Sequence, residues 1–186
     1  MRLLTPAASR RVPWKNGLGS TLEIATDAAA PGGEWTWRLS IADVPSRERF
    51  SIFPGIDRSI ACLSGPGLIV ELAGARAAVP SEGVALSFAG EELVTGEPLG
   101  PRVRDVNLML RRDRWRGRMT LARGRACELD APLVLVHAPG DSPGLRVATE
   151  EGAFELAPGG TLVASGCVVI AGAPGSVGVA CALTPV

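Results

Sequence analysis

The sequence predicts an all-β protein of the sandwich or barrel type, and two observations support this. The 23 glycines and 15 prolines of the 186-residue chain divide it into short apolar runs that are separated by turn residues. No long stretch repeats its apolar residues with the helical period, although 46% of the residues are apolar. A chain of this length can bury a sizeable core, either as one compact body or as two small ones.

The stretch FSIFPGIDRSIACLSGPG predicts two apolar strands, each followed by a turn. Residues 50–53 and 60–63 are the apolar runs, and the turn dipeptide Pro54-Gly55 lies between them. Charge appears only at this bend, as Asp57 and Arg58. A bend between two apolar strands is a common place for polar groups that bind a ligand.

Three further segments alternate polar and apolar residues, which is typical of strands. They span residues 21–25, 35–41 and 105–111, and each has one polar face. In a plain sandwich such faces are solvated, whereas in a small barrel that holds a ligand they line the lumen. Periodicity alone does not choose between these arrangements. The ionisable and amide groups concerned are Glu23, Arg38, Asp105 and Asn107.

The loop before the first of these strands has the composition of a binding loop. Trp14, Lys15, Asn16 and Gly17 combine an aromatic ring, a cation, an amide and a flexible backbone. Lys15 is the sole lysine among nineteen basic residues, and Asn16 is one of two asparagines, so we infer that a substitute would not work at either position. The alternative is a capping loop whose tryptophan plugs the end of a barrel.

Charge and apolar segments narrow the class of protein. Nineteen basic and nineteen acidic residues cancel, which argues against a dedicated nucleic-acid binder. The start, MRLLTPAASRR, lacks the apolar core of a signal peptide, so we expect a cytoplasmic protein. Glycines and a proline interrupt the apolar stretch 161–186, which predicts buried strands and no membrane span. The four cysteines lack ligand spacing and are expected to be core thiols.

A basic run over residues 111–125 marks the expected boundary between two halves, 1–112 and 113–186. We interpret this run as a solvated strand face or a connection between domains, and a phosphate or nucleic-acid patch is the alternative. His137 lies in an apolar strand without an acidic or thiol neighbour at ligand spacing. We therefore expect a core or rim histidine, with a general base as the less favoured interpretation.

The ending LSGPG resembles the turn that closes the first motif of a cupin barrel, and GAFELAPGG resembles the second motif. Metal-binding cupins have histidine and glutamate in the first motif, at positions that hold Ser51, Phe53 and Arg58 in this sequence. The ligand positions of the second motif hold Val163 and Cys167. Arginine keeps its proton and cannot bind a metal ion. We therefore expect no metal and no cofactor, and a site that suits an anion.

Five segments together resemble the HutD/Ves family: VPWKNGLGSTLEI, WRLSIADV, FSIFPGIDRSIACLSGPG, FAGEELVTGEPLG and DVNLMLRR. Leu18 departs from the resemblance, because the family tends to have glycine there. The resemblance implies a fold of two cupin (RmlC-like jelly-roll) barrels packed as one bicupin unit. It also implies an association with histidine utilisation, with a small pathway intermediate such as formylglutamate or urocanate as ligand. No enzymatic activity is firmly implied.

We therefore predict a metal-free bicupin that binds a small carboxylate and has a regulatory or buffering role. Arg58 is expected to contact the carboxylate, because its planar fork matches that group, and Lys15 would add charge. Hydrogen bonds would come from Asn16, Ser51 and Asn107. An apolar wall would be formed by Trp14 and Phe53. Arg58 would be held in place by Glu23, Arg38 and Asp105.

Two other functions stay open. One is a metal-independent isomerase or hydrolase of a small acid, with Glu23 or Asp105 as general base and Lys15 or Arg58 as electrophilic stabiliser. The lack of an identifiable nucleophile–base pair counts against this function. The other is a protein-interaction module. A homodimer also stays open, and nucleic acid and membrane are not expected partners.

Overall fold

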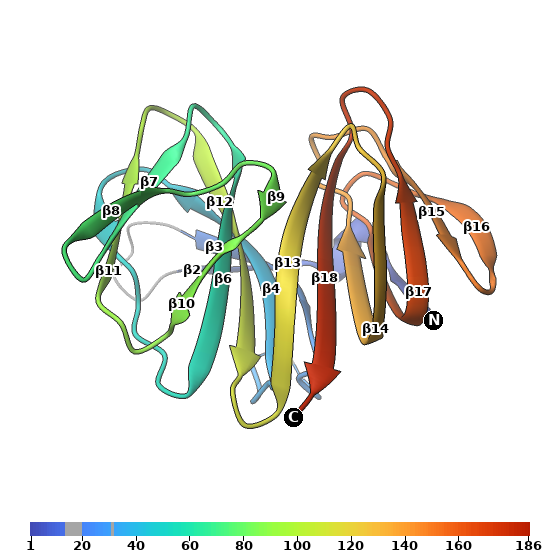
Figure 1. Ribbon diagram of the computed structural model, residues 1–186, viewed down its shortest axis with the longest axis horizontal. Coiled ribbons are helices and arrows are strands. Elements are labelled where there is room, and N and C mark those ends of the chain that lie inside the picture. Colours follow the sequence, from blue (N-terminus) through green and yellow to red (C-terminus); the bar gives the residue numbers. More distant parts are fainter. Residues whose placement is uncertain (14–19, 31) are drawn as a thin grey trace. The chain divides into compact units, whose positions relative to one another are not determined.

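The computed structural model describes residues 1–13, 20–30 and 32–186, and almost every regular element in it is a β-strand (Figure 1). These residues contain one short 3-10 helix, η1 (Pro6–Ala8), and no α-helix. None of the helical structure described is long and apolar enough to cross a membrane. The predicted all-β class is confirmed.

The chain forms two compact units. The N-terminal unit consists of Arg10–Ser81 and Ala85–Trp115, and the C-terminal unit of Met1–Ser9, Glu82–Val84 and Arg116–Val186. The chain finally leaves the N-terminal unit between Trp115 and Arg116, close to the expected boundary after residue 112. Two short segments from the first half of the sequence belong to the C-terminal unit, because β1 (Arg2–Leu4) and β9 (Gly83–Val84) pair with its strands.

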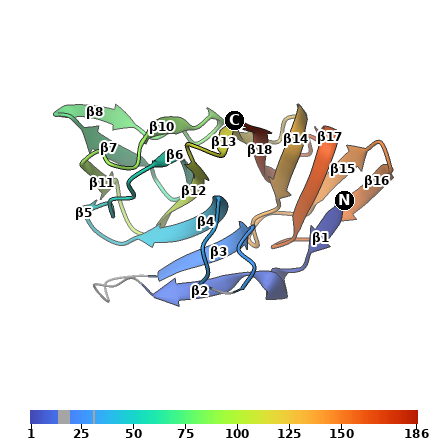
Figure 2. The same cartoon turned by 90° about the horizontal axis from the view of Figure 1, so that it is seen from below.

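Two sheets make up the N-terminal unit, and Figure 2 shows them facing each other. The six-stranded sheet has the order β10-β6-β12-β4-β3-β2. Its strands are β2 (Arg10–Pro13), β3 (Ser20–Thr26), β4 (Trp37–Val44), β6 (Ile56–Ser64), β10 (Leu86–Ala89) and β12 (Val103–Arg111). The four-stranded sheet has the order β5-β11-β7-β8, formed by β5 (Glu48–Arg49), β7 (Leu68–Leu72), β8 (Ala75–Ala78) and β11 (Val94–Pro98).

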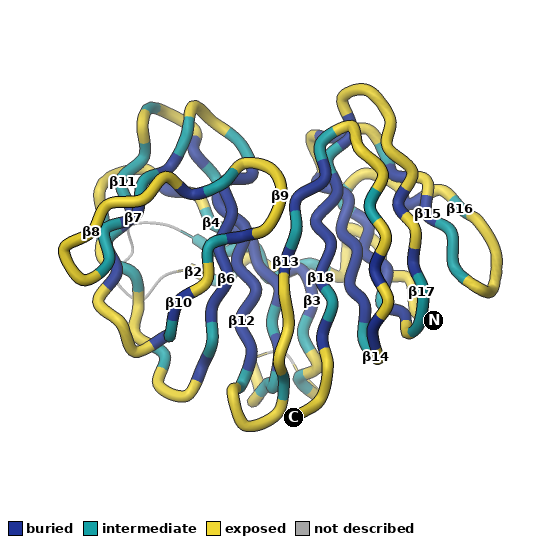
Figure 3. Tube along the Cα trace, in the orientation of Figure 1, coloured by how far each residue is buried: buried dark blue, intermediate teal, exposed yellow. Residues whose placement is uncertain are grey.

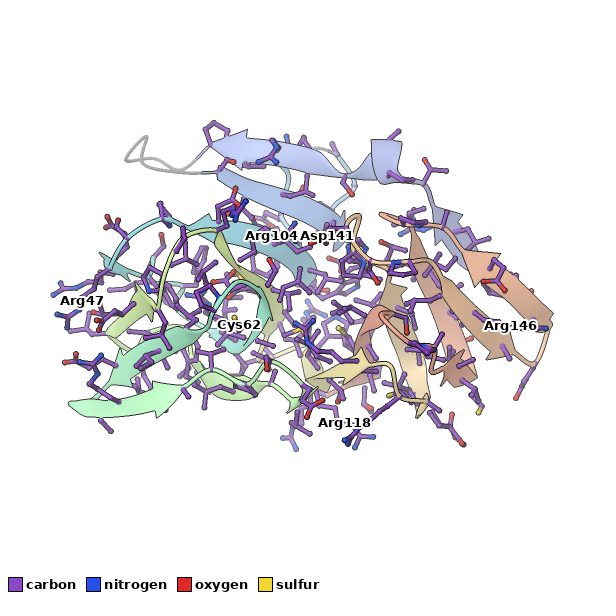
Figure 4. All side chains as sticks on the ribbon, turned by 90° about the horizontal axis from the view of Figure 1, so that it is seen from above. Arg47, Cys62, Arg104, Arg118, Asp141 and Arg146 are labelled. Atoms are coloured by element: carbon purple, nitrogen blue, oxygen red, sulfur yellow. The ribbon has the colours of Figure 1, made fainter. Side chains whose placement is uncertain are left out.

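Apolar side chains of both sheets share one core in this unit. Ile60 and Cys62 of β6 lie in the same buried cluster as Val70 of β7 and Val94 of β11, and Figure 4 labels Cys62 among the side chains that fill this interior. Figure 3 colours long parts of β6 and β12 dark blue, as buried. Two sheets with a common core give the N-terminal unit a closed interior.

One sheet forms the C-terminal unit, in the order β16-β15-β17-β14-β18-β13-β9, with β1 paired to β17. An apolar cluster in this unit includes Val136, Leu162 and Val168. Buried strands over residues 161–186 are confirmed, as β17 and β18. The strands are β13 (Trp115–Arg123), β14 (Cys127–His137), β15 (Leu145–Thr149), β16 (Gly152–Leu156), β17 (Thr161–Ala171) and β18 (Val177–Pro185).

Three local predictions need correction. Residues 50–53 are not a strand, because Phe50 and Phe53 donate isolated backbone hydrogen bonds to Val94 and Gly90 without continuing a ladder. Asp57 and Arg58 lie inside β6, so the bend is confined to the residues before Ile56. The cysteines are all thiols, but only Cys62 and Cys181 are buried, since Cys127 and Cys167 lie on partly exposed strands.

Candidate functional site

Arg58 projects from β6 into the interior of the N-terminal unit. In the register of the six-stranded sheet, Arg58 lies opposite Phe88 of β10 and opposite Met109 of β12. Directly opposed residues share a face of the sheet. This face also carries Ile60 and Cys62, which belong to the core between the two sheets. Arg58 is only 5% exposed, which is rare for an arginine and demands partners.

Polar residues continue along the same inner face. Asn107 of β12 lies opposite Ser40 of β4, and Ser40 lies opposite Glu23 of β3. Asp105 and Asn107 are 2% and 4% exposed, and the side chains of Glu23 and Arg38 are each 14% exposed. The alternation found in the sequence therefore belongs to a lumen-facing surface, and the solvated arrangement is excluded for these strands.

A chain of hydrogen bonds joins Arg58 to Asp105 through Asn107. Arg58 Nη2 donates to Asn107 Oδ1 at 2.7 Å, and Asn107 Nδ2 donates to Asp105 Oδ1 at 2.8 Å. Arg58 Nη1 donates to the backbone carbonyl of Ser51 at 3.3 Å. Asn107 thus separates the guanidinium from the carboxylate. Arg58 Nε is buried and has no hydrogen-bond partner among the described residues.

Three phenylalanine rings surround the Arg58 guanidinium. Its Cζ lies 5.2 Å from the ring centre of Phe50, 5.7 Å from that of Phe53 and 5.1 Å from that of Phe88. Ring faces attract a cation within about 6 Å. Only Phe53 belongs to the predicted site. Phe88 lies opposite Arg58 in the pairing of β10 with β6, and the sequence alone does not give this pairing. Phe50 lies in the stretch FSIFPGIDRSIACLSGPG, at whose bend polar ligand-binding groups are predicted.

Burial shifts the proton affinities of this cluster. Desolvation raises the pKa of Asp105 to about 7, although the nearby Arg58 charge and the hydrogen bonds from the Ala42 backbone and Asn107 work in the opposite direction. Desolvation also lowers the pKa of Arg58 to about 10, which leaves it charged at neutral pH, and Asp105 counteracts this shift. The Arg58–Asn107–Asp105 chain therefore gains one positive charge when Asp105 takes up a proton.

A second ion pair lies on the same face. Glu23 Oε2 is 3.3 Å from Arg38 Nε, and Glu23 Oε1 is 3.4 Å from Arg10 Nη2. Arg38 Nε is buried but not aligned for a hydrogen bond with any described residue. Desolvation lowers the pKa of Arg38, and Glu23 opposes this shift. The inner face thus holds two arginines, Arg38 and Arg58, and two carboxylates, Glu23 and Asp105, while Arg10 is exposed at its edge. These four charges cancel when all are ionised, and one positive charge remains when Asp105 is protonated.

These residues do not fit the metal ion that many cupins hold. A guanidinium at the centre of the cluster repels a divalent cation and offers it no lone pair. The described residues contain no group of three or more histidine, cysteine or acidic side chains arranged to hold a metal ion.

In the C-terminal unit His137 is buried, and its Nδ1 is 2.9 Å from Thr161 Oγ1. Desolvation lowers the pKa of His137 to about 4.

The structure brings most of the predicted site residues together. Arg58, Asn107 and Asp105 form the hydrogen-bond chain, and Phe53 contributes a ring. Ser51 takes part through its backbone carbonyl while the residue itself is exposed. Glu23 and Arg38 lie on the same face and pair with each other. The remaining three, Trp14, Lys15 and Asn16, lie outside the described residues.

The fold and the inner face define a cupin-type β-protein whose cluster suits an anion better than a metal ion. A cupin-2 barrel protein from Leptotrichia buccalis shares the fold, with a TM-score of 0.51 over 92% of this chain and 91% of that one at 11% identity. The chain belongs to the HutD family, whose model matches residues 7–176. The resemblance drawn from the sequence motifs is confirmed.

Curated relatives match about three fifths of the chain. An uncharacterised 21.2 kDa protein in the hutC 3′ region of Pseudomonas putida is 39% identical over 121 residues, 64% of this chain and 63% of its own length. Protein Ves of Citrobacter koseri is 33% identical over 117 residues, 61% of each chain. The chain therefore spans less than two thirds of the length of these relatives.

Solved structures match over nearly the full chain. Protein PA5104 of Pseudomonas aeruginosa PAO1, described as conserved and of unknown function, has a TM-score of 0.84 at 30% identity over 98% of both chains. HutD from Pseudomonas fluorescens SBW25, determined in a formate condition, has a TM-score of 0.78 at 27% identity over 100% of this chain and 98% of that one.

Proposed function

We propose that the N-terminal unit binds a small carboxylate at Arg58 without a metal ion, in a regulatory or buffering role. The observation that carries this proposal is the buried guanidinium whose Nε has no hydrogen-bond partner among the described residues. Asn107 and the Ser51 carbonyl use only part of its donor capacity. A buried donor without an acceptor is costly, and a carboxylate would accept two parallel hydrogen bonds from the guanidinium.

The class of ligand follows from charge and from the family. The inner face carries a surplus of one positive charge when Asp105 is protonated, and the Arg58 guanidinium among three phenylalanine rings favours an anion of small size. The resemblance to the HutD/Ves family implies a carboxylate of histidine utilisation, of the formylglutamate or urocanate type, and the family match supports this choice. A cytoplasmic location, a homodimer and the absence of nucleic-acid binding stay predictions.

Thermal unfolding with a panel of acids tests this proposal. The panel contains formate, acetate, glutamate, formylglutamate, urocanate and a sugar acid, each with and without EDTA. The variants are Arg58→Met and Arg58→Lys. Arg76→Gln is a matched control, because Arg76 is exposed on β8 and pairs with Glu97. A ligand at a hundred times its Kd should add about 2.7 kcal/mol, equivalent to several degrees in Tm.

We expect at least one carboxylate to stabilise the wild type and Arg76→Gln but not Arg58→Met, with or without EDTA. Arg58→Lys should respond weakly, because an ammonium group lacks the planar fork. Equal stabilisation of wild type and Arg58→Met would place the anion elsewhere. No stabilisation by any acid would reject carboxylate binding and favour the protein-interaction module.

Asp105 favours one second candidate, a metal-independent isomerase or hydrolase of a small acid. Its pKa of about 7 is suited to a general base near neutral pH. Incubation of each stabilising acid with the protein, followed by NMR, distinguishes the two functions. Turnover that Asp105→Asn abolishes would support the enzyme, and an unchanged ligand spectrum would support binding alone.

A further inference from the structure

We propose that Arg112, Glu91 and Asp57 form a clamp that positions the segment 50–56 against Arg58 and thereby sets the affinity of the site for a carboxylate. This inference rests on the proposed function and assigns positioning residues to it. Asp57 belongs to β6, Glu91 lies in the turn after β10, and Arg112 directly follows β12. They are named the Arg112 clamp below.

The clamp joins three segments that are far apart in the sequence. Arg112 Nε donates to Asp57 Oδ1 at 2.7 Å, and Arg112 Nη2 donates to Glu91 Oε2 at 2.9 Å. Arg112 Nη1 also donates to Glu91 Oε1 at 3.2 Å, which makes the contact with Glu91 bidentate. The hydrogen bonds from Arg112 and from the Gly55 amide lower the pKa of Glu91 to about 2, so the Glu91 carboxylate stays ionised at neutral pH.

The same residues hold the backbone of the turn on both sides of Gly55. The Gly55 amide donates to Glu91 Oε1 at 2.7 Å, and the Gly55 carbonyl accepts from the Arg112 amide at 2.9 Å. Arg112 Nη2 also donates to the Ile56 carbonyl at 3.4 Å. The turn is therefore held by the side chains of Glu91 and Arg112 together with isolated backbone hydrogen bonds.

Three of the groups that contact Arg58 belong to residues 50–53, directly before this turn. The Ser51 carbonyl accepts from Arg58, and the rings of Phe50 and Phe53 lie against its guanidinium. The Phe53 amide donates to the Gly90 carbonyl, next to Glu91. A Cβ at Gly90 would lie only 2.4 Å from the Phe53 carbonyl, so this contact is close. A displaced turn would move the carbonyl and the ring that orient Arg58.

Stability alone does not explain an arginine with two carboxylates at this place. The side chains of Glu91, Arg112 and Asp57 are 40%, 46% and 49% exposed, and exposed ion pairs stabilise proteins little. Among the described residues, the ion pair of the neighbouring Arg111 is with Asp113, two residues away, at 2.8 Å. The sequence motifs FPGIDR, FAGEE and DVNLMLRR each contribute one member of the clamp, although the proposed carboxylate contact itself needs only Arg58.

An NMR titration with sodium formate tests the clamp. The samples are wild type, Arg112→Gln, Glu91→Gln and the matched control Arg111→Gln, and the observed signal is the Arg58 Nε–H proton. Rings within about 6 Å of the guanidinium shift its protons upfield, so this signal reports the position of Phe50 and Phe53 as well as formate binding. Glu91→Gln serves if Arg112→Gln fails to fold.

We expect Arg112→Gln to weaken formate binding roughly 2- to 30-fold, the range for residues that act through others, and to move the Arg58 signal downfield. Arg111→Gln should behave like the wild type in both respects. An unchanged formate midpoint with an unmoved Arg58 signal in Arg112→Gln and Glu91→Gln would overturn the clamp. If formate does not bind the wild type, the carboxylate proposal fails, and an unmoved signal in the variants would then overturn the positioning role as well.

Discussion

At the scale of single residues, an amide rather than a carboxylate is the direct side-chain partner of the buried Arg58. Asn107 accepts from Arg58 with its oxygen and donates to Asp105 with its nitrogen. A direct bidentate pair with Asp105 would occupy the guanidinium fork. The interposed amide leaves donors of Arg58 available while Asp105 still supplies charge compensation.

Asn107→Leu should destabilise the protein by about 2 kcal/mol or more. The substitution leaves both Arg58 Nη2 and Asp105 Oδ1 buried without this partner, and unsatisfied buried groups cost about 1–3 kcal/mol, more when charged. Urea unfolding followed by tryptophan fluorescence measures the change. Ser46→Ala is a suitable comparison, because Ser46 bonds to Glu48 at the surface. Equal urea midpoints for both variants would contradict a structural role for Asn107.

Anion binding should strengthen as the pH falls through 7. Burial raises the pKa of Asp105 to about 7, so below that pH the carboxyl is neutral and no longer offsets the charge of Arg58. Formate stays ionised over this range. We expect roughly 3- to 10-fold tighter binding at pH 5.5 than at pH 8.5.

Calorimetric titration of formate at the two pH values measures this effect. Asp105→Asn is isosteric and neutral at both, so its affinity should not change between pH 8.5 and 5.5. A pH dependence in Asp105→Asn as large as that of the wild type would assign it to another group.

At the scale of elements, strand register decides which side chains meet. Arg58, Asn107, Ser40 and Glu23 share the inner face only because β6, β12, β4 and β3 pair as they do. A shift of one residue in any pairing would turn a strand's polar residues to the opposite face. The turn that follows β6 helps to fix this register, because it brings Gly65 against β12.

Gly65→Ala should destabilise the N-terminal unit more than Gly74→Ala does. Both glycines have positive φ, +97° and +81°, and both substitutions therefore strain the backbone. A Cβ at Gly65 would also lie 2.8 Å from Cα of Val103, whereas nothing lies within 4 Å of a Cβ at Gly74. We expect a further cost of about 1–3 kcal/mol at Gly65, measured by urea unfolding. Equal costs would show that the turn relaxes freely.

At the scale of the whole molecule, the two units have different interiors. The N-terminal unit buries an arginine, an aspartate and an asparagine on one inner face. The buried polar residues described in the C-terminal unit are uncharged at neutral pH, and they are His137, Ser142, Thr161 and Ser176. The only histidine, His137, is buried and bonded to Thr161. This difference places the candidate site in the half of the chain that carries the family motifs.

The two units should respond to acid in opposite directions. The pKa of Asp105 is raised in the folded state, so its contribution to the free energy of unfolding is present at pH 4 and lost as the pH rises through 7. The pKa of His137 is lowered to about 4, so its contribution is present at pH 7 and lost as the pH falls from 6.5 to 4. Each effect amounts to roughly 3–4 kcal/mol at most.

Unfolding of Asp105→Asn and His137→Gln between pH 4 and pH 7 separates these contributions. Relative to the wild type, Asp105→Asn should lose more stability on acidification, and His137→Gln should lose less. Profiles parallel to that of the wild type in both variants would mean that neither group has a shifted pKa.

The amino-acid sequence was enough to predict the all-β class, the family and the polar residues of three strands. The spacing of glycine and proline predicted the all-β class, and the alternation of polar and apolar residues identified Glu23, Arg38, Asp105 and Asn107. Residue-type logic also marked Arg58 as the group that excludes a metal ion, because arginine cannot supply a lone pair.

The direction in which those side chains point and the groups that they contact became known from the three-dimensional structure. A solvated face and a lumen face have the same period of two, so the sequence cannot distinguish them. The enclosure of Arg58 by Phe50 and Phe88, the use of the Ser51 carbonyl and the Arg112 clamp all join segments through strand pairing and turns. These contacts depend on register, which is set by the packing of the whole unit rather than by any single segment.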